Sequence, residues 1–201
     1  MRVNLSMSLI VLVAVGAFSL PVDAQHEQSE ISVNFTGNFQ KEATSFAGKT
    51  DSATHSGGVL LNYRYHFNRW SAIETNYGST RFSQNYSSGY TTQARANEVT
   101  LAYVTTLGRP ASARVRPFFE AGTGALLFSP IAAGSTVGGR TQSEGLFLYG
   151  GGVDWRADRN VSVRLGYRGL LYTAPDFVVA VQTTNARTHM AEPYIGISFR
   201  F

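Results

Sequence analysis

The chain of 201 residues contains no cysteine. This absence excludes a disulfide framework and any metal site built on thiolates. Lysine is almost missing as well, because Lys41 and Lys49 are the only two, and charged residues make up 15% of a chain that is 43% hydrophobic. This charge content is low for a water-soluble domain, and the apolar content is too high for a disordered chain.

Long hydrophobic runs are also scarce. The longest, from Leu9 to Leu20, follows Arg2 and precedes small residues that end at Ala24. This order is typical of a secretory signal peptide, so we expect residues 1–24 to be cleaved during export. A permanent anchor is the alternative interpretation, but the run is shorter than the ~20 residues that a spanning helix needs. Residues 25–201 are then expected to form one domain.

After Ala24 no apolar run could form a transmembrane helix, so a membrane role would have to use strands. Apolar residues at period two predict eight strands, at 30–39, 57–67, 70–82, 94–107, 114–128, 143–156, 160–173 and 188–201. Short turns alternate with longer polar connections, as in outer-membrane barrels, whose short turns face the periplasm. The sequence therefore predicts an all-β fold, an eight-stranded antiparallel up-and-down transmembrane β-barrel.

Charged residues occupy the strand positions between the apolar ones. An arginine facing lipid at mid-bilayer costs about 2–4 kcal/mol, so we expect the charged face to line the lumen, which in an eight-stranded barrel is just wide enough for side chains. A soluble barrel with exchanged faces is the alternative, and the scarcity of lysine disfavours it. The predicted lumen ion-pair network comprises Arg64, Glu74, Glu98, Arg114, Arg116, Glu120, Glu144, Asp154, Arg164, Arg168, Glu192 and Arg200.

The chain ends with "EPYIGISFRF", in which apolar residues alternate up to an aromatic residue. This stretch resembles the last strand of outer-membrane β-barrel proteins, and "RLGYRGLLYTAPDF" (residues 164–177) is similar to the penultimate strand of the outer membrane β-barrel domain family. Residues 25–201 as a whole resemble small barrels of the OmpA and OmpX type. The resemblance implies an outer-membrane location and a signal that the barrel assembly machinery reads during biogenesis. Its residues would be Ile195, Ile197, Phe199 and Phe201.

Some barrels of this size modify lipids, so groups that could take part in catalysis are relevant. The histidines are His26, His55, His66 and His189. Of these, His189 is expected near the outer rim, where the residues that could lie within its reach are Ser143, Asp176 and Glu192. A nucleophile needs a base within hydrogen-bonding distance, and no motif indicates one. We expect no catalytic residues, no metal site and no cofactor, and no nucleic-acid partner because the basic residues are lumenal or at the rim.

Basic residues also fall toward the proposed outer rim. We consider Arg81, Arg95, Arg140 and Arg187, together with Lys41 and Lys49, as candidate contacts for the phosphates of lipopolysaccharide, with ordinary solvated charge as the alternative. The expected function is a non-enzymatic integral outer-membrane barrel that displays four long surface loops for envelope integrity or surface interaction, with an extracellular ligand that the sequence does not identify. The alternatives are a narrow small-solute pore and a lipid-modifying enzyme.

Overall fold

The computed structural model describes residues 28–41, 43–44, 50–86, 91–107, 113–131, 140–174 and 187–201. The predicted signal peptide lies outside them. The strands are β1 (Ser29–Gln40), β2 (Ala43–Thr44), β3 (Thr50–Ala53), β4 (Ser56–His66), β5 (Ser71–Tyr86), β6 (Thr91–Thr106), β7 (Val115–Pro130), β8 (Gln142–Arg156), β9 (Val161–Thr173) and β10 (Arg187–Arg200). In this part of the chain, no helix is long and apolar enough to cross a membrane.

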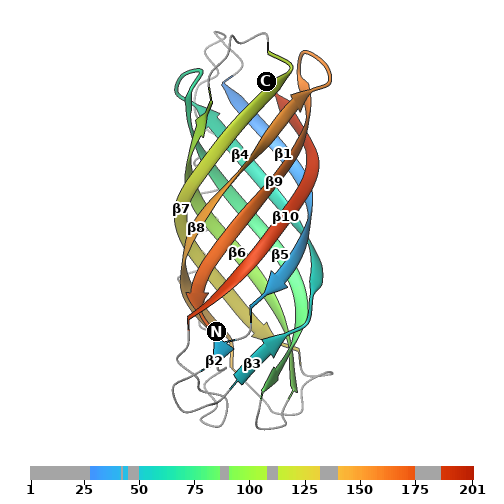
Figure 1. Ribbon diagram of the computed structural model, residues 1–201, viewed down its shortest axis with the longest axis vertical. Coiled ribbons are helices and arrows are strands. Elements are labelled where there is room, and N and C mark those ends of the chain that lie inside the picture. Colours follow the sequence, from blue (N-terminus) through green and yellow to red (C-terminus); the bar gives the residue numbers. More distant parts are fainter. Residues whose placement is uncertain are drawn as a thin grey trace, which may run out of the picture.

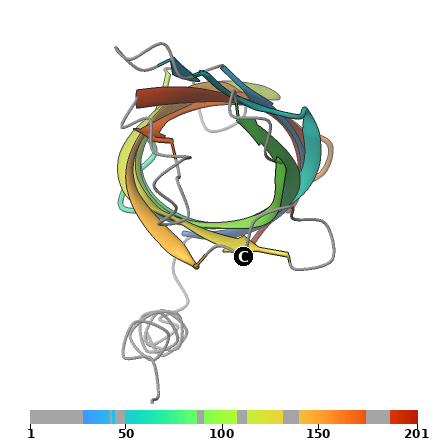
Figure 2. The ribbon, with the colours of Figure 1, turned by 90° about the horizontal axis from the view of Figure 1, so that it is seen from below.

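Eight long strands, β1 and β4 to β10, form a closed barrel. Each pairs antiparallel with the strand that follows it, and β1 pairs with β10 to close the cylinder. The strands are tilted relative to the long axis (Figure 1), and the view along that axis shows a continuous ring (Figure 2). The fold is therefore the predicted eight-stranded antiparallel up-and-down barrel.

The two ends of the barrel differ. One end, called here the short-turn end, carries the reversals at 67–70 and 157–160 and also Phe201, and it is uppermost in Figure 1. The opposite end, called the loop end, carries the connections 41–55, 87–90, 131–141 and 174–186. The short strands β2 and β3 lie at the loop end, where β3 pairs with the last residues of β5.

Two of the predicted loops are partly strand. β5 continues to Tyr86 instead of ending at residue 82, and β6 begins at Thr91 instead of residue 94. The predicted loop over 41–56 contains β2 and β3. These segments are polar and carry no apolar alternation, but antiparallel pairing needs none where both faces of a hairpin can be solvated. Period-two alternation of apolar residues therefore does not indicate these strands.

Apolar side chains form a band around the outside of the barrel. Phe35 is 69% exposed, Ile197 62% and Leu165 60%. Water-soluble monomers rarely expose a continuous apolar surface of this kind, whereas a barrel in a bilayer requires one. The residues at the alternate positions point inward and are buried, among them Arg164 at 0% exposure. This orientation excludes the soluble barrel with exchanged faces.

Candidate functional site

Arg164, on β9, lies at the centre of the short-turn half of the lumen. Its Nε donates to Asp154 Oδ1 at 2.7 Å, its Nη1 to Glu74 Oε2 at 3.3 Å, and its Nη2 to Glu30 Oε1. Asp154 stands directly opposite Arg164 in the β8–β9 register. Glu74 comes from β5, four strands away around the ring. One planar guanidinium on β9 therefore connects its own strand to three others, β8, β5 and β1, through the lumen. Arginine is better suited to this role than lysine.

Arg64 binds two of the same carboxylates. Its Nε donates to Glu74 Oε2 at 2.6 Å, and its Nη1 donates to Asp154 Oδ2 at 3.3 Å. The two like-charged guanidiniums also share the ring of Phe118, whose centroid is 4.6 Å from Arg64 Cζ and 5.3 Å from Arg164 Cζ. Shared carboxylates and a shared aromatic face offset their mutual repulsion.

Glu30 completes this cluster, although it was absent from the predicted network. Its Oε2 accepts from Arg200 Nη2 at 2.8 Å and lies 3.6 Å from His66 Nε2. The alternation along β1 indicates that Glu30 points inward, because it precedes the outward residues Ile31 and Val33 at the opposite phase. With it, three bases and three acids balance, and we call them the balanced cluster: Arg64, Arg164, Arg200, Glu30, Glu74 and Asp154.

A second charged group, the acid-rich cluster, surrounds Arg168 further toward the loop end. It comprises Arg168, Glu98, Glu120 and Glu192. Arg168 Nη2 donates to Glu98 Oε1 and lies 3.4 Å from Glu192 Oε2. Glu120 accepts a hydrogen bond from the hydroxyl of Tyr194 at 3.4 Å. All four residues are at most 4% exposed. Two carboxylates, those of Glu98 and Glu192, therefore share one guanidinium, and Glu120 adds a third acid that has no ion pair with a described residue.

Toward the loop end the lumen contains an apolar group of side chains, so the predicted ion-pair network occupies only part of the interior. Polar side chains lie in the same half, where Asn38 Nδ2 donates to Thr80 Oγ1 at 3.2 Å. Phe128 packs against Tyr172 at 5.8 Å between ring centroids and against Phe82 at 5.9 Å. We call the buried group the apolar cluster: Ala94, Ala96, Ala102, Leu126, Phe128, Leu146, Leu148, Leu170, Tyr172 and Met190. The sequence interpretation assigned apolar residues to the lipid face and did not consider those that point inward, such as Leu148 in the middle of β8.

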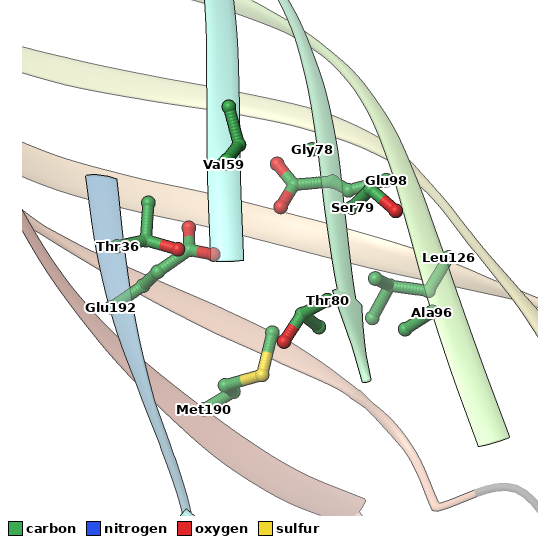
Figure 3. Close-up of a pocket in the computed structure, with 10 residues that line it drawn as sticks. All are labelled: Thr36, Val59, Gly78, Ser79, Thr80, Ala96, Glu98, Leu126, Met190 and Glu192. Atoms are coloured by element: carbon green, nitrogen blue, oxygen red, sulfur yellow. The ribbon is translucent and has the colours of Figure 1, made fainter. Parts of the chain in front are cut away.

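A small cavity lies where the acid-rich and apolar clusters meet. The carboxylates of Glu98 and Glu192 line one part of it, and Leu126 and Met190 line another (Figure 3). It has room for about one water molecule. Oε2 of Glu192 is buried without a hydrogen-bond partner in the described part of the chain.

Four predicted network residues do not join an ion pair with any described residue. One is Glu120, whose contact with Tyr194 is a hydrogen bond. Arg114 is exposed just before β7, and Arg116 is half-buried with an Nε that has no hydrogen-bond partner in the described segments. Glu144 is half-buried and accepts from Gln142 Nε2 at 2.6 Å. Arg114, Arg116 and Glu144 lie near the two ends of the barrel, where water can solvate a charge. The structure brings the remaining predicted members together in the two charged clusters.

The candidate residues outside the lumen are exposed. Arg81, Arg95, Arg140, Arg187 and Lys41 lie at or toward the loop end, and Lys49 is outside the described residues. On β10, Ile195, Ile197, Phe199 and Phe201 all point away from the lumen and are 50–62% exposed. Their recognition by the assembly machinery stays a prediction.

His189 does not form a site with Glu192, the acid expected within its reach on the same strand. His189 Nε2 is 3.0 Å from the hydroxyl of Tyr149 on the outer face, whereas Glu192 on the same strand points into the lumen. These two residues therefore cannot act together, and Asp176 and His26 lie outside the described residues. No three His, Cys, Asp or Glu side chains in the described segments are grouped so that they could hold a metal ion.

A closed barrel with an apolar band facing lipid and charges in its lumen is an outer-membrane type of β-barrel. The model of the family "Outer membrane protein beta-barrel domain" matches residues 10–201, and the chain belongs to this family. No curated protein sequence matches it.

Solved structures with this fold include Neisserial surface protein A (NspA), which is 13% identical with a TM-score of 0.61 over 86% of this chain and 97% of that chain. OprG from Pseudomonas aeruginosa is 11% identical with a TM-score of 0.61, covering 87% and 96%. Ail of Yersinia pestis is 20% identical with a TM-score of 0.52, covering 88% and 100%. At these identities the likeness concerns the fold.

Proposed function

We propose that this protein is a sealed, non-enzymatic barrel that anchors its loop-end connections at the cell surface, for envelope integrity or surface interaction. The observation that carries the proposal is the filled lumen. The balanced cluster, the acid-rich cluster and the apolar cluster follow one another along the axis, and the side chains within them are buried or nearly so.

These layers oppose permeation for different physical reasons. An ion crossing the charged layers would have to displace a guanidinium from buried carboxylates, and an unpaired buried charge is strongly unfavourable. An ion crossing the apolar cluster would lose its own hydration without compensation. We therefore expect the charged clusters to block the lumen even where the apolar cluster is weakened.

Planar-bilayer recording of the purified protein tests the proposal. We expect no reproducible conductance steps from the wild type, and none after Phe128→Ala with Leu148→Ala, because the charged layers remain. A variant that also carries Arg164→Ala and Arg64→Ala should conduct if it folds, which its heat-modifiable migration would report. Wild-type steps whose size changes on replacing Arg164 or Glu120 would instead establish the narrow-pore alternative.

The lipid-modifying alternative has less support. It relied on His189 with acids near the rim, and the nearest candidate along the strand, Glu192, faces the opposite side of β10. The hydroxyl of Tyr149 is the hydrogen-bonding partner of His189 instead. A phenol in that position orients the ring but does not supply the carboxylate that a catalytic histidine usually needs.

A further inference from the structure

Two arginines face each other on the outside of the barrel. Arg81 on β5 stands directly opposite Arg95 on β6, and both side chains are exposed. Side chains directly opposite in an antiparallel pair have Cβ atoms about 5 Å apart, and like charges there are destabilising. Neither guanidinium has an ion pair or a side-chain hydrogen bond among the residues that the structure describes. The pair therefore lacks a counter-charge.

The outward pairs along this hairpin change character in order. The pair Tyr77 and Val99 belongs to the apolar band. The next outward pair is Ser79 and Asn97, in which Ser79 Oγ donates to Asn97 Oδ1 at 3.0 Å. The arginine pair follows directly. A sequence of apolar, polar and cationic rows is what the boundary between hydrocarbon and charged headgroups requires.

The height of the arginine pair agrees with this boundary. Ten residues separate Ser71, at the short-turn end of β5, from Arg81. At about 3.3 Å per residue and a tilt of about 40°, this corresponds to roughly 25 Å, which is the height of the apolar band of such barrels. The arginines therefore lie at the edge of the bilayer nearest the loop end.

We propose that Arg81 and Arg95 together bind a phosphate of a phosphorylated lipid headgroup in the outer leaflet, of the lipopolysaccharide class. Two planar forks on adjacent strands can each donate a pair of hydrogen bonds to different oxygens of one phosphate. The bound anion supplies the missing counter-charge. This inference rests on the proposed function only in requiring the loop end to face outward, and it holds whether or not the lumen conducts.

Native mass spectrometry of the protein in phosphatidylcholine nanodiscs, with bisphosphorylated lipid A as the probe, tests the site. The Arg81→Gln, Arg95→Gln double variant should bind lipid A at least tenfold more weakly than the wild type. The matched control is Arg69→Gln with Arg114→Gln, which removes the same charge from exposed positions at the short-turn end. Control binding should stay within twofold of wild type.

Three outcomes would overturn the proposal: undiminished binding by the outer double variant, an equal loss in the control, or equal binding of a dephosphorylated lipid A. Competition with inorganic phosphate distinguishes a lipid headgroup from a soluble phosphate as the bound anion. If it displaces lipid A at equal concentration, the site serves soluble anions and the lipid assignment is wrong. Heat-modifiable migration verifies folding, and if the double variant does not fold, each single variant should show at least a threefold loss.

Discussion

Tyr194 separates the two charged clusters of the lumen. It stands opposite Gly166, which lies between Arg164 and Arg168 on the inner side of β9. A Cβ on Gly166 would be 2.5 Å from Tyr194 Cζ, so only glycine leaves space for this ring. The phenol hydroxyl donates to Glu120 at 3.4 Å. The ring thus divides a layer with equal numbers of acids and bases from a layer in which acids predominate.

The imbalance in the acid-rich cluster gives a prediction with opposite outcomes for two neighbours. Arg168→Gln should destabilise the barrel by about 3–5 kcal/mol, because it leaves the buried carboxylates of Glu98 and Glu192 without their cation. Glu192→Gln should change stability by less than about 1 kcal/mol, because Glu98 still pairs with Arg168 and one repulsive charge is gone. Urea unfolding in lipid vesicles, followed by tryptophan fluorescence, measures both.

The control for this pair is Glu144→Gln, which removes the same charge from a half-buried position outside the cluster. It should lie within about 0.5 kcal/mol of wild type. An equal and large loss of stability for Arg168→Gln and Glu192→Gln would show that Glu98 and Glu192 do not compete for one guanidinium.

At the scale of the elements, the seam between β1 and β10 closes the barrel, and it requires close backbone approach. On the inner face of β10, Gly196 stands opposite Asn34. A Cβ on Gly196 would overlap Val33 O and would lie 2.6 Å from Asn34 Cα. Because backbone atoms of a paired strand cannot move aside as a flexible side chain can, a substituent here strains the pairing itself.

Gly196→Ala should therefore lower the free energy of unfolding by about 1–3 kcal/mol, the range for overpacking. Gly145→Ala on β8 is the matched control, because its Cβ would meet no atom within 4 Å. That change should be neutral or slightly stabilising, since alanine restricts the unfolded chain more than glycine does. The temperature at which the folded band disappears on a gel compares them. Equal temperatures would indicate that the seam can relax.

The whole molecule combines an apolar exterior with three lumenal layers of different chemistry. Each layer draws on strands that are distant in sequence, as when Glu74 on β5 meets Arg164 on β9. The lipid band, in contrast, needs only a continuous apolar face on each strand. A substitution in the band therefore probes the position of the barrel in the bilayer, with little effect on the lumen.

Substitutions of Leu101 and Leu107 test the position of the barrel in the bilayer, because both are leucines on the same segment of chain. They are 50% and 47% exposed, but Leu101 is five residues inside the short-turn end of β6 and Leu107 is just beyond it. Leu101→Arg should cost about 2–4 kcal/mol and Leu107→Arg about 0–1 kcal/mol, because the cost of a lipid-facing arginine falls with distance from the midplane. Urea titration in vesicles measures the difference. Equal costs would contradict the assigned band.

Local alternation was sufficient to predict the barrel. Lipid lies on one side of each strand and a narrow, filled lumen on the other, so each strand can present only one of its two faces to lipid. The alternation of apolar and other residues then indicates which side chains point outward, as for Val33 next to Asn34 and Leu101 next to Ala102. The number of long strands, their outward faces and the burial of most charges followed from this rule. Polar strand ends such as those near Tyr86 and Thr91 escaped it, because backbone pairing in water leaves no mark on hydropathy.

Only the tertiary structure decided which charges meet. The pairing of Arg164 with Glu74 depends on closure and on the register of four intervening strand pairs, and the opposition of Arg81 and Arg95 depends on the length of one hairpin. Register is set by the sum of many backbone and packing interactions, and a slip of two residues would keep every facing while exchanging every partner. Period-two alternation therefore determined the inside and outside of this protein, whereas non-local strand pairing determined its lumen layers and its outer arginine pair.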